Sequence, residues 1–157
     1  MKQPNVQKIH TLRGHKDCVY TLAPTKEAGV FISGGGDGMV VRWDLQEPEQ
    51  GKVIAKVEAS VYALHFNAHF NHLLVGQNYE GIHIIDLEQH KSLGSLKMTQ
   101  ASIFDIATYR DKIFVATSDG QVTVLDYQKL AILHRIQESN ERARSIAIHL
   151  GNNELIV

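Results

Sequence analysis

The chain has 157 residues, of which 43% are hydrophobic, and a formal net charge of −1 at pH 7. This length and apolar content suffice for one domain with a hydrophobic core and argue against a disordered chain. The near-neutral charge argues against a dedicated nucleic-acid surface, and the apolar runs are too short to span a membrane.

Short runs rich in Val, Ile and Leu recur along the chain and predict β-strands. In chain order we expect strands at 8–12, 19–22, 30–33, 39–43, 53–57, 61–66, 73–75, 82–85, 93–96, 103–107, 113–116, 122–125, 132–136, 146–149 and 154–157. No window of a dozen residues carries a good apolar helical face, although residues 65–72 can be read as helical in isolation. The sequence therefore predicts an all-β fold.

These strands recur with a fixed period. Similar segments begin at Val19, Val61, Ile103 and Arg144, at steps of 42, 42 and 41 residues. A period of about 40–45 residues is typical of an array of like units. Each of the first three units contains four expected strands, so we expect four-stranded sheets.

A tight connection is expected between the second and third strands of each unit. An acidic residue followed by glycine stands there three times, at Asp37-Gly38, Glu80-Gly81 and Asp119-Gly120. Such pairs are expected to supply the positive φ values that tight hairpins need.

The first unit carries Gly14-His15, Ser33, Asp37-Gly38 and Trp43-Asp44. This pattern resembles the WD40 repeat, whose Gly-His and Trp-Asp dipeptides bracket one blade of a β-propeller. The resemblance implies a structural tetrad in which Trp43 bonds Ser33, Ser33 bonds His15, and His15 bonds Asp37. A catalytic Ser-His-Asp interpretation is disfavoured, because the tetrad would sequester Ser33 from any substrate.

The second and third units depart from this pattern, with Ile85 and Leu125 in place of the tryptophan. The resemblance nevertheless implies WD40-type β-propeller blades, as four-stranded antiparallel sheets, through residues 1–157. We expect a closing fourth strand at 8–12, blade 1 at 14–58, blade 2 at 59–98, blade 3 at 99–137 and the first half of blade 4 at 143–157. Family propellers most often have seven blades, so we expect an incomplete ring, the N-terminal half of a longer propeller. The alternative is completion by a second chain or copy.

The resemblance also implies a partner-binding top face, near the start of the first strand of each blade and just before the turn acid. The matching positions are Cys18, Tyr20, Ser60, Tyr62, Tyr79, Ser102, Phe104, Ser118, Arg142 and Arg144. Aromatic and arginine side chains dominate interface energetics. The alternative for Tyr20, Tyr62 and Phe104 is packing between blades, whereas the two arginines are expected to be exposed.

We expect a non-catalytic scaffold that binds a protein or peptide, with no cofactor, metal, nucleic acid or membrane as partner. Cys18, as the single cysteine, cannot form an internal disulfide, which favours a reducing compartment and predicts a cytoplasmic protein.

The alternative class is a propeller enzyme, either a metal-dependent hydrolase or a cofactor-binding protein. The first-strand positions offer Tyr, Tyr, Phe and Arg, which cannot ligate calcium. His65, His69 and His72 have a spacing that would suit zinc on a helix, but on a strand and turn they would scatter.

Overall fold

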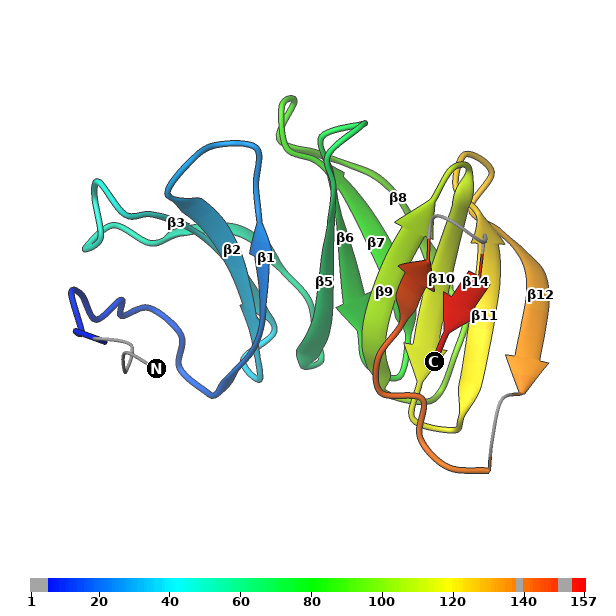
Figure 1. Ribbon diagram of the computed structural model, residues 1–157. Coiled ribbons are helices and arrows are strands. Elements are labelled where there is room, and N and C mark those ends of the chain that lie inside the picture. The colour runs from blue at the N-terminus through cyan, green and yellow to red at the C-terminus, as the bar shows by residue number, and fades with distance from the viewer. Residues whose placement is uncertain (1–5, 138–139, 150–153) are drawn as a thin grey trace, which may run out of the picture.

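The computed structural model describes residues 6–137, 140–149 and 154–157, which form fourteen β-strands. The strands make three four-stranded antiparallel sheets and one two-stranded sheet (Figure 1). No helix in the described part of the chain has the length and apolar character needed to cross a membrane. The all-β prediction and the grouping of strands by fours are confirmed.

Each sheet is a meander whose strands follow chain order. Sheet 1 contains β1 (Val19–Pro24), β2 (Val30–Gly35), β3 (Met39–Asp44) and β4 (Lys52–Lys56). Sheet 2 contains β5 (Val61–Asn67), β6 (His72–Gln77), β7 (Gly81–Asp86) and β8 (Lys91–Lys97). Sheet 3 contains β9 (Ile103–Tyr109), β10 (Lys112–Thr117), β11 (Gln121–Asp126) and β12 (Ala131–Gln137), and sheet 4 contains β13 (Ala147–His149) and β14 (Glu154–Ile156).

The sheets stand side by side in an open arrangement (Figure 1). Their first strands are neighbours, because β1 contacts β5, β5 contacts β9 and β9 contacts β13. Successive sheets therefore meet face to face and bury apolar side chains between them, as expected of blades that stack radially.

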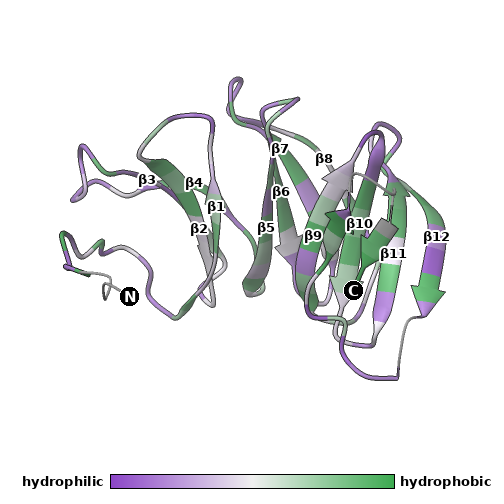
Figure 2. Ribbon diagram, viewed as in Figure 1, coloured by the Kyte–Doolittle hydropathy of each residue, from purple (hydrophilic) through white to green (hydrophobic). Residues whose placement is uncertain are grey.

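Three clusters of buried side chains form the core, one at each junction between sheets. The junction of sheets 1 and 2 includes Ile32, Val40, Val61, Leu73 and Val75, and the junction of sheets 2 and 3 includes Leu74, Ile82, Ile103, Ile113 and Val115. Figure 2 shows that hydrophobic residues concentrate on the strands and hydrophilic ones on the connections. Because each sheet is buried on the faces it shares, its strands carry runs of Val, Ile and Leu.

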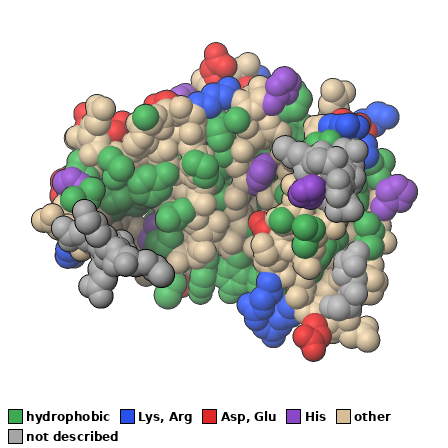
Figure 3. Space-filling model, viewed as in Figure 1, with side chains coloured by type: hydrophobic (Ala, Val, Ile, Leu, Met, Phe, Trp, Pro, Cys, Tyr) green, Lys and Arg blue, Asp and Glu red, His purple; other side chains and the backbone are tan. Residues whose placement is uncertain are grey.

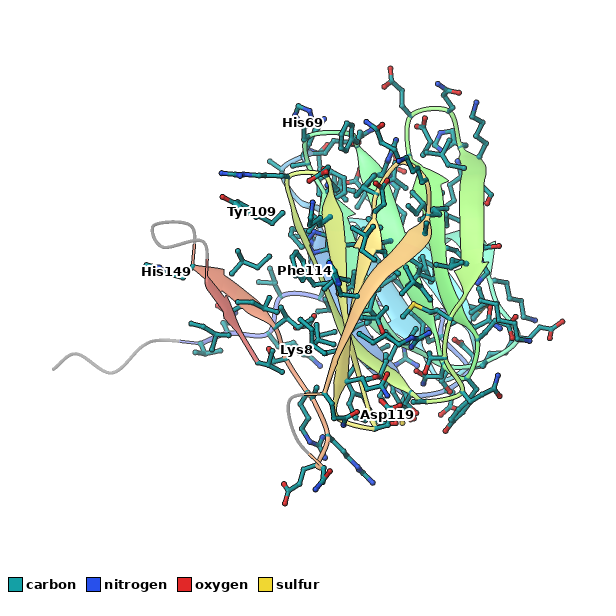
Figure 4. The ribbon with its side chains drawn as sticks, turned by 90° about the vertical axis from the view of Figure 1, so that its right-hand side faces the viewer. Lys8, His69, Tyr109, Phe114, Asp119 and His149 are labelled. Atoms are coloured by element: carbon teal, nitrogen blue, oxygen red, sulfur yellow. The ribbon has the colours of Figure 1, made fainter. Side chains whose placement is uncertain are left out.

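Sheet 4 packs on sheet 3 through the third cluster. Phe114 lies between β10 and the β13–β14 hairpin, as Figure 4 shows. It packs with Ile148 and Leu155 against a cluster that contains Ala116 and Ile146.

Residues 8–12 do not form a strand in the structure, which differs from the expected closing strand. A strand needs a ladder partner, and no described strand pairs with this segment. Instead, residues of this segment border a hollow beside sheet 1 that is also lined by Val19, Leu22 and Trp43. Val19 and Leu22 are exposed, and Figure 3 shows hydrophobic side chains gathered at the left, where Figure 1 places sheet 1. A closing role for residues 8–12 stays a prediction.

The turn of sheet 2 also differs from the prediction. Gly38 and Gly120 have positive φ, but in sheet 2 the positive φ belongs to Tyr79 (φ 63°) and not to Gly81. Gly81 is needed for another reason: a β-carbon there would collide with the carbonyl oxygen of Leu96 on β8. The glycine thus allows two backbones to approach closely, and the positive φ occurs two residues earlier, at Tyr79.

Candidate partner-binding site

A chain of hydrogen bonds links four side chains of sheet 1. The indole Nε1 of Trp43 donates to Ser33 Oγ over 2.7 Å, and Ser33 Oγ lies 2.7 Å from Nε2 of His15. His15 Nδ1 lies 3.0 Å from Oδ1 of Asp37. Because an ionised carboxylate only accepts, Nδ1 carries the proton and Nε2 accepts the hydroxyl hydrogen of Ser33. Every polar group of this tetrad is then paired.

Asp37 anchors the tetrad to the neighbouring backbone. Its carboxylate also accepts the backbone N–H groups of Lys16 (2.7 Å) and Met39 (3.1 Å). Burial acts to raise the pKa of Asp37, but the hydrogen bonds from Lys16, His15 and Met39 together outweigh it and lower the pKa. Ser33 is only 2% exposed, so its hydroxyl cannot meet a substrate, and the arrangement suits a structural role.

A β-bulge occurs at the start of the first strand in each of sheets 1, 2 and 3. The pairing of β1 with β2 shifts between Val19 and Thr21, which leaves Tyr20 as the extra residue. The corresponding shifts leave Tyr62 extra in β5 and Phe104 extra in β9. A bulge bends the strand and re-aims the side chain of the extra residue. Three aromatic side chains are therefore redirected in the same way.

These three rings lie in a row that crosses the sheets. The ring centroids of Tyr20 and Tyr62 are 4.4 Å apart in an edge-to-face arrangement, and those of Tyr62 and Phe104 are 6.1 Å apart and stacked. The guanidinium carbon of Arg144 lies 5.5 Å from the centre of the Phe104 ring, within cation–π range. We call Tyr20, Tyr62, Phe104 and Arg144 the aromatic row.

The aromatic row is partly open to solvent. Tyr20 is 50% exposed, whereas Tyr62 and Phe104 are half-buried and Arg144 is exposed. The proximity of Tyr62 is the main cause that raises the pKa of Tyr20. The side chains thus pack across blades and also present a surface, so both expected roles of the aromatic residues are compatible with the structure.

The other predicted contact residues fall into two groups. Cys18, Tyr79 and Arg142 are exposed, as partner contact requires. The three serines instead make hydrogen bonds within the protein. Ser60 Oγ donates to the carbonyl of Gly36 on sheet 1 over 3.4 Å, and Ser118 Oγ accepts the backbone N–H of Ser102 within sheet 3 over 3.0 Å. Ser102 is buried, so the structure removes its side chain from the accessible surface.

Arg142 and Arg144 line a hollow of about 500 Å³ next to the end of the aromatic row. Its other lining residues are Ser118, Asn140 and Glu141. In Figure 1, the orange segment of residues 140–146 passes along the lower edge of sheet 3, where the β10–β11 turn lies. The salt bridges found among the described residues involve neither arginine.

Two further polar residues at the sheet junctions escaped the sequence analysis as structural links. Asn78 is 1% exposed, and its Oδ1 accepts the backbone N–H of Ile103 over 2.8 Å. Asp105 accepts the backbone N–H of Ile146 over 2.7 Å. In the sequence, Asn78 and Asp105 are marked only as polar residues at or within an apolar run. That pattern does not reveal which backbone group each one bonds.

The three histidines that could suggest zinc do not converge. His65 Nε2 lies 2.8 Å from Thr108 Oγ1, His72 Nδ1 lies 3.2 Å from the hydroxyl of Tyr127, and His69 packs on Phe70. Within the described ranges, no three His, Cys, Asp or Glu side chains are grouped to hold a metal ion. Figure 4 shows His69 and Tyr109 toward one end of the sheets and Asp119 at the other.

His65, His72 and His83 predict a loss of stability in mild acid. Burial lowers the pKa of His65, His72 and His83, partly offset by Asp105, Asp86 and Glu80 respectively. Below the unfolded pKa of about 6.5 the unfolded chain binds protons that the folded chain does not. The stabilisation is therefore complete above this pH and is lost as the pH falls toward the lowered pKa values.

Urea denaturation at pH 7.5 and at pH 5.5 tests this expectation. We expect the free energy of unfolding to be lower at pH 5.5. His65→Gln should reduce the difference between the two pH values, whereas replacement of His134, which is exposed on β12, should not. Equal stability of the wild type at both pH values would contradict the expectation.

Comparisons with known proteins agree with this architecture. Residues 6–44 match the family model described as WD domain, G-beta repeat. The chain is 37% identical over 96 residues to small ribosomal subunit protein RACK1z of Arabidopsis thaliana, covering 60% of the chain and 28% of that protein. It is 31% identical over 121 residues to small ribosomal subunit protein RACK1 of Medicago sativa, covering 73% of the chain and 36% of that protein. The chain thus spans about a third of the length of these relatives.

Solved structures of designed proteins share the fold. The computationally designed Ika4 protein superposes with a TM-score of 0.75 at 19% identity, covering 96% of each chain. The computationally designed Ika8 protein gives a TM-score of 0.72 at 20% identity, covering 88% of this chain and 42% of that one.

Proposed function

Because the chain is a WD40-repeat protein built of β-propeller blades, we propose that it is a non-catalytic scaffold that binds a protein or peptide partner along the aromatic row. The observation that carries the proposal is the repeated bulge, which aims Tyr20, Tyr62 and Phe104 into one row at the same edge of three sheets. Rigid strands hold the rings in place, so little side-chain entropy is lost when a partner binds.

The composition of the row suits a protein interface. Aromatic and arginine side chains are the residues that most often form hot spots. Tyr20 and Arg144 are exposed at the two ends of the row, and Tyr79 stands exposed on the turn of sheet 2. Tyr79 also holds a left-handed backbone conformation, which is uncommon for a non-glycine residue.

The proposal extends to location and assembly. Cys18 is an exposed free cysteine, which is compatible with a reducing compartment, and we place the protein in the cytoplasm. The relatives carry the name of a small ribosomal subunit protein, which fits a scaffold within a larger assembly. A longer chain or a second copy would complete the ring.

The triple change Tyr20→Ala/Tyr62→Ala/Arg144→Ala tests the site. We expect it to weaken partner binding by about 100-fold, because each removed side chain is a candidate hot spot. The measurement is quantitative affinity capture from a cell extract, followed by titration of the captured partner against purified wild-type and variant protein.

Phe70→Ala is the matched control, because Phe70 is an exposed aromatic residue that lies outside the row and packs with His69 and Tyr127. It should leave affinity unchanged. A partner that binds the triple variant as tightly as the wild type, with both proteins folded, would remove the aromatic row from the interface. A hydrolase activity that stays with the protein through repurification would instead favour the enzyme class.

A further inference from the structure

Two arginines at one end of the aromatic row form no ion pair with a carboxylate among the described residues. Arg142 and Arg144 are both exposed and line the same hollow of about 500 Å³. Among the described residues, ion pairs join Arg42 to Glu27 at 2.8 Å, Lys97 to Glu80 at 3.2 Å and Lys112 to Asp111 at 3.0 Å. The described residues offer no such ion pair to either arginine of the hollow.

The hollow is chemically suited to an anionic side chain. A guanidinium group binds a carboxylate through two parallel N–H donors. Ser118, which also lines the hollow, uses its hydroxyl oxygen to accept the N–H of Ser102, so its hydroxyl hydrogen is available to a ligand. Glu141 belongs to the same lining. Its carboxylate would repel a ligand carboxylate that lies away from the two arginines, so the position of the acidic group in the ligand matters.

The hollow continues the aromatic row. Arg144 belongs to both, since its guanidinium group lies over the ring of Phe104. The steps along the row from Tyr20 to Arg144 are 4.4, 6.1 and 5.5 Å, so at most about five residues of extended peptide, at about 3.3 Å per residue, would cover it. A single linear segment can therefore contact the rings and the arginines together.

We propose that the site selects a linear peptide segment that carries aspartate or glutamate at the end lying on Arg142 and Arg144, with apolar side chains on the rings. This inference rests on the proposed function and specifies its partner. A single-stranded nucleic acid could also stack on aromatic rings, but the chain has a net charge of −1, and the described lining of the hollow offers two cations, Arg142 and Arg144, beside the acidic Glu141. A peptide with local negative charge fits this balance better than a polyanion.

Two peptide pools test the proposal. Each pool contains fluorescein-labelled peptides of about nine residues. Leucine is fixed at one position in both pools. The other fixed positions carry glutamate in one pool and glutamine in the other. We expect the glutamate pool to bind the chain about tenfold more tightly at low salt. The preference should shrink as salt screens the exposed arginines.

Variants separate the charge preference from the binding site itself. Arg142→Gln/Arg144→Gln should abolish the preference for glutamate. Arg110→Gln, which removes one positive charge at an exposed arginine outside the site that packs over Tyr109, should keep it, as the single variant Arg144→Gln, with the same charge change, should not. Tyr62→Ala should weaken both pools.

Each other outcome overturns a defined claim. Equal binding of both pools that is lost in Tyr62→Ala would overturn the acidic preference and leave the proposed function standing. Preferential binding of a phosphoserine pool or of a single-stranded oligonucleotide would also overturn the acidic-peptide assignment. Binding of no probe at all would count against the aromatic row as a peptide site and against both proposals.

Discussion

Replacing Ser33 with alanine is expected to lower the free energy of unfolding by about 2–3 kcal/mol. The hydroxyl oxygen of Ser33 accepts the indole N–H of Trp43 and its hydrogen is bonded to His15. Removing it leaves a buried donor on Trp43 and a buried acceptor on His15, each with the desolvation cost but without a partner. Urea denaturation at pH 7.5 measures the loss.

The control for Ser33 is Ser92→Ala on β8, where the serine is exposed and the change should stay within about 0.5 kcal/mol. The double variant Ser33→Ala/His15→Ala should lose less than the sum of the single losses, because both residues act in one network. Unchanged stability of Ser33→Ala would show that the tetrad does not stabilise the blade. Loss of a catalytic activity at full stability would restore the Ser-His-Asp interpretation.

Replacing Gly81 with alanine is expected to cost about 3 kcal/mol. The added β-carbon would overlap the carbonyl oxygen of Leu96, and Gly81 is itself paired with Lys97 in the ladder between β7 and β8. Relief of the clash therefore requires movement of backbone rather than rotation of a side chain. Since Leu96 packs against the cluster between sheets 2 and 3, that movement would also disturb the core.

Gly94→Ala on β8 is the matched control for Gly81. Its β-carbon would meet the terminal Cδ1 of Leu130 at 2.7 Å, and a flexible side chain can yield where a backbone carbonyl cannot. Thermal and urea denaturation of both variants should show the larger loss for Gly81→Ala. Equal losses, or a smaller loss at Gly81, would mean that β8 can move aside at little cost.

The prediction of strands from sequence succeeded because the relevant signals are local. Runs of Val, Ile and Leu, the acid-glycine turns and the period of about 42 residues each involve near neighbours or simple repetition. The second unit shows what such local signals cannot predict. Strand order and grouping agree, but the turn of sheet 2 bends at Tyr79 and uses Gly81 for close packing. A dipeptide pattern cannot distinguish those two uses of glycine.

The candidate site could be predicted only as a set of positions. The resemblance placed Tyr20, Tyr62 and Phe104 near the start of successive first strands, with exposure and interior packing as open alternatives. Whether the rings meet depends on bulges in three separate ladders and on the spacing of sheets that are about 42 residues apart in the chain. Ser102 illustrates the converse, because its position matches the pattern while the folded chain buries it, with its backbone N–H bonded to Ser118.

The sequence by itself determined the β-strands, their grouping into repeating sheets and the residue types of the tetrad, because strand periodicity, turn chemistry and hydrogen-bonding capacity are properties of short segments. Only the tertiary structure decided which side chains face one another across sheets: the aromatic row, the unpaired arginines beside it, and the links made by Asn78 and Asp105. The physical reason is that contacts between sheets depend on strand register and blade orientation, which are set by the burial of whole apolar faces rather than by neighbouring residues in the chain.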